Sequence, residues 1–474
     1  RNVGRGERRH KQHARTMRLA QTALLGLLLA GCAPTIPPLP DAAQVDPPPV
    51  WRTDPGSTAA LQQGWWRRFG DPVLSALVER ALANNTDIAI AAARVREARA
   101  QEALSRSQLF PSLDLGVAAA DQRALNPFGT ATESRVVQPV FQAAYEVDLF
   151  GRVSDQVEAA RQGTLASQAA QEAAALGIAA ATATGYITLR AIDARLEIVE
   201  ETLASRAEAL RIARNRAEVG YTSDLELRQA EAEYEVAAQL VPQVRLAISR
   251  QENALSLLIG ENPAPVERGA ALDQLQQPAL PDTLPSQLLR QRPDIAQAEF
   301  TLAASDATLA AARAQFLPQV RLSASAGAVA SSVLGDPVAV WSLGGSILAP
   351  IFNAGRNQAQ FDVAAARRDQ AAFGYRRTVL TAFREVEDNL AAVARLREQL
   401  EALQAQRTAL ASALQHARNR YEAGYSAYLE QLDAQRALLN AELSLVQTEA
   451  DALNATIGVF QALGGGWSSD QLTH

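Results

Sequence analysis

The chain is a tandem duplication, and this repeat constrains its fold more than any local motif does. Residues 87–111 have a counterpart at residues 294–318, at an offset of 207 positions. Both segments begin with Asp-Ile-Ala and reach a Pro 24 residues later. Further along, Gly220 matches Gly424 at an offset of 204, so the copies differ in length by three residues just after these segments. The sequence therefore predicts two copies of one structural unit.

Long helices dominate both copies. Residues 151–220 and 355–424 are rich in Ala, Arg, Glu, Gln and Leu, and about 65 residues of each run predict about 100 Å of helix. The segments that follow, residues 225–259 and 429–463, have the same character and about half the length. We expect Pro242 to break or kink the first of these shorter helices.

A glycine separates each long helix from its shorter partner. Gly220 and Gly424 directly follow the long runs, where Gly supplies the left-handed residue that ends a helix. In the first copy, Ser223 or Asp224 can cap the next helix. These breaks predict the tips of two antiparallel helical hairpins, at residues 220–224 and 424–428.

The segments after Pro111 and Pro318 are the strand-like parts of the chain. Apolar and polar residues alternate over residues 141–149 and 320–326, which is the pattern of a half-buried or lipid-facing strand. We expect about two strands in each copy, within residues 113–149 and 320–351.

Four strands cannot close around a lumen, since the smallest useful barrels have about eight. Open sheet edges are also not tolerated in hydrocarbon. In a membrane the strands would have to be completed by other copies of the chain, and three copies would supply about twelve. A soluble pair of small hairpins is the alternative.

The single cysteine, Cys32, follows a segment typical of export signals. Residues 1–31 hold seven basic residues and one acidic residue, with a short apolar run at residues 24–30 that cannot span a bilayer. We interpret Met17 as the true start, with residues 1–16 upstream of it. An ordinary signal peptide with an incidental cysteine is the alternative to a lipoprotein signal.

The remaining chain has a tether and an acidic balance. Residues 32–64 are rich in Pro and predict an extended tether. Without residues 1–31 the chain holds 38 basic and 50 acidic residues, which argues against nucleic acid as a partner.

The sequence does not indicate an enzyme. The histidines are His10, His13, His416 and His474, and no cysteine or second histidine lies within metal-ligand spacing of His416. No Gly-rich phosphate loop or nucleophile elbow is found. We therefore expect no catalytic residues, no metal and no cofactor besides a covalent lipid at Cys32.

Taken together, these residues resemble the bacterial outer membrane factors, the TolC-like efflux ducts, and more closely their lipoprotein branch, which is OprM-like and often labelled the NodT family. The resemblance covers nearly everything from Cys32 to about residue 464. Its most specific parts are the lipobox at Cys32 and these motifs: Trp65-Trp66, Asp71-Pro72, Asn84-Asn85, Phe110-Pro111, Leu317-Pro318 and Asp433-Ala434-Gln435-Arg436. The resemblance implies that Cys32 is acylated, and Ala33 in place of Asp implies sorting to the outer membrane.

The resemblance also implies the architecture. The fold would be mainly α with a small β part, and a homotrimer would form a twelve-stranded β-barrel in the outer membrane that continues into a twelve-helix α-barrel in the periplasm. The expected domains are a signal peptide (1–31), a lipid-anchored tether (32–64), a first repeat (65–264), a linker (265–285), a second repeat (286–466) and a tail (467–474).

The implied function is a passive duct in a tripartite efflux system. It would export small molecules from the periplasm, or from an inner-membrane pump commonly of the resistance–nodulation–division type, with a periplasmic adaptor docked on the hairpin tips. The expected adaptor contacts are Gly220, Tyr221, Thr222, Ser223, Gly424, Tyr425 and Ser426.

The family's periplasmic gate corresponds here to Leu429, Glu430, Asp433 and Arg436. Spacings of three and four place Leu429, Asp433 and Arg436 on one helix face, and threefold symmetry would turn each into a ring. The first hairpin has Gln229 where the second has Asp433, so the gate would rest mainly on the second repeat. An ordinary solvated helix face is the alternative.

Two other non-enzymatic classes differ from a duct. A lipid-anchored periplasmic coiled-coil scaffold would have no pore and would not need membrane strands. A periplasmic adaptor would carry one helical hairpin and a larger β-rich remainder.

Overall fold

The computed structural model describes residues 33–54, 61–125 and 127–472. The predicted signal peptide and lipid site, residues 1–31 and Cys32, lie outside these residues. The chain divides into two compact units. Unit 1 comprises Arg1–Gln44, Val95–Ser167 and Ala298–Arg376, and unit 2 comprises Val45–Arg94, Gln168–Gln297 and Arg377–His474. Each unit therefore combines segments from both predicted repeats.

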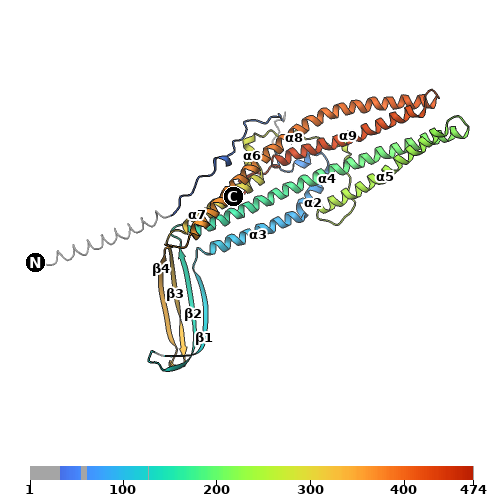
Figure 1. Cartoon of the computed structure of the whole chain (residues 1–474). Coiled ribbons are helices and arrows are strands. Elements are labelled where there is room, and N and C mark those ends of the chain that lie inside the picture. The colour runs from blue at the N-terminus through green and yellow to red at the C-terminus, as the bar shows by residue number, and fades with distance from the viewer. Residues whose placement is uncertain (1–32, 55–60, 126, 473–474) are drawn as a thin grey trace. The chain divides into compact units, whose positions relative to one another are not determined.

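The sheet of unit 1 contains four strands, two from each repeat (Figure 1). The strand order is β1-β2-β3-β4 and every neighbouring pair is antiparallel. The strands are β1 (Ser112–Leu125), β2 (Ala131–Val147), β3 (Gln319–Ser331) and β4 (Val338–Leu348). The predicted strands are confirmed, and the outer strands β1 and β4 each pair with only one strand among the described residues.

One face of this sheet is apolar and the other is polar. Residues directly opposite each other in antiparallel strands share a face. Leu115 pairs with Phe141, Phe141 with Ala326, and Ala326 with Trp341, so one apolar row crosses all four strands. The adjacent row is polar and consists of Asp114, Gln142, Ser325 and Ser342.

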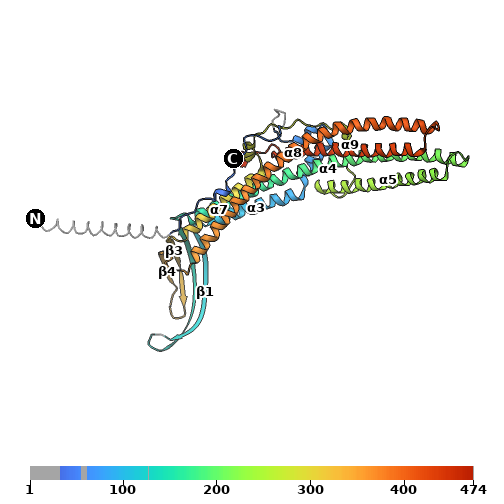
Figure 2. The same ribbon diagram turned by 45° about the horizontal axis from the view of Figure 1, so that its top comes forward.

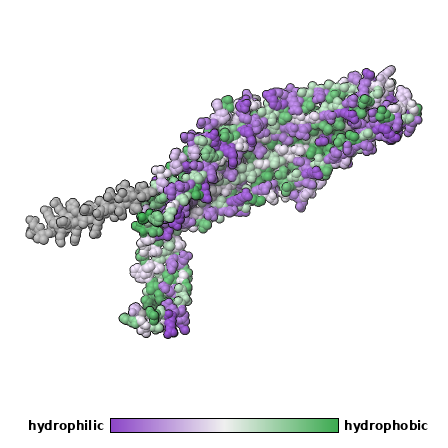
Figure 3. All heavy atoms as spheres, in the orientation of Figure 1, coloured by the Kyte–Doolittle hydropathy of each residue, from purple (hydrophilic) through white to green (hydrophobic). Residues whose placement is uncertain are grey.

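The apolar row is not covered by the described residues of unit 1. Leu115 is 60% exposed and Trp341 is 80% exposed. Hydrophobic side chains are visible along the strands in Figure 3. An exposed apolar face of this size marks a surface that is covered by lipid or by another protein.

Helices on either side of the strands match between the repeats. α3 (Thr86–Ser107) and α7 (Pro293–Ala314) each have 22 residues, and they start 207 positions apart. α4 (Arg152–Glu218) and α8 (Arg356–Glu422) each have 67 residues and start 204 positions apart. The two offsets found in the sequence are therefore the offsets of the helices.

The Pro-rich N-terminal segment is bound to unit 1. Arg368 donates from Nη1 to the carbonyl of Pro37 at 2.6 Å and from Nη2 to the carbonyl of Pro38 at 3.0 Å. Arg313 donates from Nε to the carbonyl of Pro34 at 2.9 Å. Arg368 is only 2% exposed, so residues 33–44 form a strap packed on α7 and α8. The described start of the predicted tether is thus held by arginines along its length.

Two helical hairpins lie side by side in unit 2, with their tips at the same end (Figures 1 and 2). α4 is followed by α5 (Asp224–Leu258), and α8 is followed by α9 (Tyr428–Ala462). α5 and α9 have 35 residues each, about half the length of the helices before them. The predicted hairpins and their proportions are confirmed.

The core of unit 2 joins both repeats around α2 (Pro72–Asn84) and the 3-10 helix Trp65–Phe69. Trp65 stacks on Phe460 with ring centroids 5.5 Å apart. The predicted linker also contributes to this core. Leu272, which begins the 3-10 helix Leu272–Gln274, and Leu275, which directly follows that helix, are both buried in it. The short helix α6 (Pro285–Gln291) follows it.

Asp71 connects three segments beside this core. Its side chain caps α2 by accepting from the Val73 N–H at 2.8 Å. It also accepts from the Tyr186 hydroxyl at 2.7 Å and from the Ala270 N–H at 3.0 Å. Burial and the bond to Asp71 raise the pKa of Tyr186, so its hydroxyl remains a donor.

The predicted break at Pro242 was wrong. α5 continues through Pro242, which is exposed, so the break does not occur. Solvent can satisfy the carbonyl that loses its donor, while buried Ala237 and Val244 hold the helix on either side. α3 is capped by Asn85, whose side-chain oxygen accepts from the Asp87 N–H at 2.8 Å.

We predict that Tyr186→Phe lowers the free energy of unfolding by about 1–2 kcal/mol, because it removes a buried donor from the Asp71 carboxylate. Thermal unfolding followed by circular dichroism measures the effect. Tyr234→Phe is the control, since Tyr234 is half-buried and no hydrogen bond of its hydroxyl is found within the described chain. Equal free energies of unfolding for the two variants would contradict the role of Tyr186.

Candidate functional site

Both hairpin tips end in the same backbone motif. Gly220 has φ of 73° and Gly424 has φ of 79°, as the left-handed position requires. The Tyr221 N–H donates to the Arg216 carbonyl, and the Tyr425 N–H donates to the Arg420 carbonyl, each at 2.8 Å. These bonds span five residues and satisfy carbonyls at the ends of α4 and α8. The predicted glycine role is confirmed at both tips.

The next helix is capped differently in each copy. Ser223 accepts from the Glu226 N–H through its hydroxyl at 3.3 Å, as predicted for one of the two candidates, and Asp224 is the first helical residue. In the second copy Ala427 occupies the cap position and has no side-chain acceptor.

The residues predicted to contact an adaptor lie together. A Cβ built on Gly424 would be 2.9 Å from the Tyr221 hydroxyl oxygen, so the two turns approach each other closely. Tyr221 is 69% exposed and Tyr425 is 81% exposed. Gly220 and Ser223 are exposed, and Thr222 and Ser426 are half-buried. The tips therefore present a small surface with two aromatic side chains.

Arg216 links the two hairpins just behind this surface. Its Nη2 donates to the carbonyls of Tyr421 at 3.2 Å and Glu422 at 3.1 Å. Its guanidinium also lies 4.5 Å from the centre of the Tyr421 ring. A cation at the carbonyl end of a helix is favourable, so Arg216 of the first hairpin stabilises the end of α8 in the second.

A tyrosine of the second hairpin forms a further hydrogen bond to the first. The buried Tyr421 hydroxyl donates to Oε1 of Glu226, on α5, at 2.7 Å. Burial and this bond raise the pKa of Tyr421, which keeps the hydroxyl protonated. Tyr428 packs on Tyr421 with ring centroids 5.7 Å apart. The tips are thus joined by hydrogen bonds in both directions.

Further along the hairpins, one carboxylate is shared by two arginines. Glu233 of α5 forms ion pairs with Arg206 of α4 and Arg436 of α9. Glu233 and Arg206 are buried, whereas the side chain of Arg436 is 52% exposed. Arg436, one of the predicted gate residues, therefore has a partner within its own chain.

The remaining predicted gate residues lie on an exposed face of α9. Tyr428, Leu432 and Gln435 are buried at helical spacing, which makes them the packed face. Leu429, Glu430 and Asp433 are exposed. Glu430 lies 3.4 Å from Arg420. Asp433 has no ion-pair or hydrogen-bonding partner in the described part of the chain.

No role was predicted from the sequence for four residues that link the hairpins: Arg216, Glu226, Glu233 and Tyr421. A signal for Tyr421 was present, because the residue 204 positions earlier is Ala217 and the two tips differ there. Nothing in a helical sequence of many arginines and glutamates distinguishes the pairs that cross between hairpins from those exposed to water.

We predict that Arg216→Lys accelerates amide hydrogen exchange around both tips, at residues 216–226 and 418–428, by about tenfold, because a lysine cannot bond two carbonyls and stack on a ring at once. Hydrogen exchange by mass spectrometry measures this. The control is Arg211→Lys, whose exposed side chain pairs with Glu208 on the same helix and with no other acid among the described residues. Exchange that changes at the first tip alone would contradict a link between hairpins.

Comparison with known proteins agrees with this architecture. Residues 77–261 and 284–465 match the model of the outer membrane efflux protein family. The chain is 34% identical to the probable efflux pump outer membrane protein TtgC of Pseudomonas putida, over 95% of this chain and 96% of that protein. It is 35% identical to the cation efflux system protein CusC of Escherichia coli, over 85% and 88%.

Solved structures show the same fold. The open-state structure of the MtrE outer membrane channel of Neisseria gonorrhoeae superposes with a TM-score of 0.81 and 31% identity, over 92% of this chain and 98% of that one. MtrE and the relatives above are outer membrane components of the TolC-like type. The chain therefore belongs to the outer membrane efflux protein family, the TolC-like outer membrane factors.

Proposed function

We propose that three copies of this chain form a passive duct that carries small molecules across the outer membrane. The observation that supports this most is the sheet of unit 1, with its exposed apolar face and the unpaired outer edges of β1 and β4. Each unpaired backbone group in hydrocarbon costs several kcal/mol, so the edges must pair with neighbouring copies. Three copies supply twelve strands, and a ring has no edge.

The helices extend this duct into the periplasm. At any one level of the tube, each chain contributes four helices. These are α4 and α8, together with either α3 and α7 or α5 and α9. Three chains therefore give a ring of twelve helices. A scaffold without a pore would not require the apolar sheet face, which disfavours that alternative.

Leu429, Glu430, Asp433 and Arg436 form the gate in this proposal. Their exposure on α9 supports it, because a ring residue must face the lumen or a neighbouring copy. Asp433 is an exposed carboxylate without a partner in the described chain, so an arginine of a neighbouring copy can pair with it. Arg436 can also exchange its bond to Glu233 for such a pair.

The tips contact a periplasmic adaptor, which couples the duct to an inner-membrane pump of the resistance–nodulation–division type. Gly220–Ser223 and Gly424–Ser426 form the contact surface, and exposed tyrosines are frequent in protein interfaces. The relative TtgC is named as a pump component, which supports partners of this kind.

A lipid on Cys32 holds the protein in the outer membrane in this proposal. The strap of residues 33–44 supports it, because Arg313 binds Pro34 only two residues after Cys32. The lipid would then start from unit 1, which also holds the apolar sheet.

We predict that the purified protein has the mass of three chains in detergent, conducts poorly in planar bilayers, and conducts several-fold better after Asp433→Ala with Arg436→Ala, because the gate loses its charged pairs. The matched control is Arg395→Ala with Glu398→Ala, which removes an exposed ion pair from α8. A water-soluble single copy would contradict the duct, and a conductance equal to the control would contradict the gate.

We predict that Cys32→Ser abolishes incorporation of radiolabelled palmitate and lowers the amount of protein recovered in the outer membrane fraction, because the acylated thiol is lost. Ser57→Cys in the same background, which restores one cysteine elsewhere, is the control and should not restore labelling. Labelling of the Cys32→Ser protein would contradict the assignment.

A further inference from the structure

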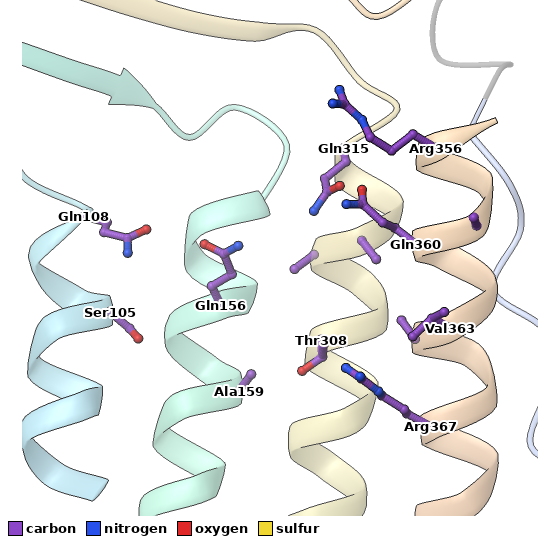
Figure 4. A pocket seen from close by; sticks show the side chains of 14 residues that line it. Ser105, Gln108, Gln156, Ala159, Thr308, Gln315, Arg356, Gln360, Val363 and Arg367 are labelled. Atoms are coloured by element: carbon purple, nitrogen blue, oxygen red, sulfur yellow. The ribbon is translucent and has the colours of Figure 1, made fainter. Parts of the chain in front are cut away.

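A hollow of about 720 Å³ lies among α3, α4, α7 and α8 within unit 1 (Figure 4). Its floor includes small residues of α7 such as Ala311 and Ala312, which leave space between the helices. Side chains from all four helices point into it in Figure 4. The hollow is large enough for a small organic molecule.

The polar lining of this hollow offers mainly hydrogen-bond donors and positive charge. It contains four glutamines and two arginines and no acidic residue: Gln108, Gln156, Gln315, Gln360, Arg356 and Arg367. In Figure 4 the Arg367 side chain extends from α8 toward Thr308 of α7, and Arg356 reaches over Gln315. Each glutamine amide supplies two donors beside the guanidinium groups.

The two arginines have no acidic partner. No ion pair or side-chain hydrogen bond of Arg356 or Arg367 is found within the part of the chain that the structure describes, and both are exposed. Three acidic groups on these helices have other partners. Asp306 faces Arg368 at 3.9 Å, Asp362 accepts from Gln358 at 2.9 Å, and Glu158 pairs with Arg161 at 3.1 Å.

The hollow is turned away from the strap. Consecutive helical residues point about 100° apart, so Arg367 and Arg368 project from different sides of α8. Arg368 binds the strap, whereas Arg367 lines the hollow. On α7, Arg313 binds the strap and Ala311, about 200° round the helix from it, lines the hollow. A strap that leads to a lipid must lie outside a duct, so the hollow belongs to the inner wall.

We propose that this hollow is a binding site for anionic solutes, in which Arg356 and Arg367, about 16 Å apart along α8, each hold a carboxylate or sulfonate group and the glutamine amides donate to further acceptors. Guanidinium groups bind such planar or multidentate anions through paired hydrogen bonds. The site rests on the proposed duct for its place on the export route, and it assigns anionic molecules as a preferred class of cargo. Three copies would place two rings of three guanidinium groups in the lumen, about 16 Å apart along α8.

Binding is tested with the trisulfonated dye pyranine and the full-length protein in detergent at low salt. Fluorescence anisotropy should show that Arg356→Gln with Arg367→Gln weakens binding by about tenfold or more. Arg106→Gln is the control, because it removes one charge from an exposed position of α3 outside the hollow. The cationic dye rhodamine 6G should not lose affinity in the double variant. Equal pyranine affinity in wild type and double variant would overturn the site.

Conduction gives a second measurement, made in the gate-opened background Asp433→Ala with Arg436→Ala. Reversal potentials in a KCl gradient should show a chloride-to-potassium permeability ratio that falls by about twofold or more after Arg356→Gln with Arg367→Gln. A conducting channel whose ratio does not change would overturn the site while the duct stands. Loss of pyranine binding in the variant, with no conductance in any protein, would instead refute the duct and retain the anion site.

Discussion

The sheet of unit 1 has more hydrogen-bonding backbone and more apolar surface than one chain can satisfy. Among the residues that the structure describes, β1 and β4 each leave an outer edge. An apolar row formed by Leu115, Phe141, Ala326 and Trp341 is not covered by other described residues of unit 1. In water this arrangement would be a site of aggregation. In a membrane it would become stable once β4 of one chain paired with β1 of the next. Membrane insertion and assembly are therefore two aspects of one constraint on this sheet.

The duplication explains why the fold combines the two halves so thoroughly. One repeat supplies two strands, which form too narrow a sheet to be stable alone. The pairing of β2 with β3 joins the two repeats within unit 1, and the stacking of Trp65 on Phe460 joins them again within unit 2. Each compact unit thus depends on both repeats, although the repeats are successive in sequence.

Much of this fold could be predicted from the sequence, because it follows from the periodicity of the apolar residues and from the glycines that end helices. The offsets of 207 and 204, the glycine ends at Gly220 and Gly424, and the strand alternation each have a direct local cause. The misses arise where tertiary context decides. Pro242 is tolerated because its side of α5 is exposed, and the strap is held by arginines more than 270 residues away. The hollow near Arg356 and Arg367 combines four helices, which no local pattern reveals.

The divergence between the two tips has a consequence for symmetry. Two similar hairpins in each of three copies would make a ring of six nearly equal positions. Tyr421 in place of Ala217, and Asp433 in place of Gln229, distinguish alternate members of that ring. A partner that bound such a ring would therefore meet two kinds of position and would fit in one rotational register, whereas six identical tips would allow two.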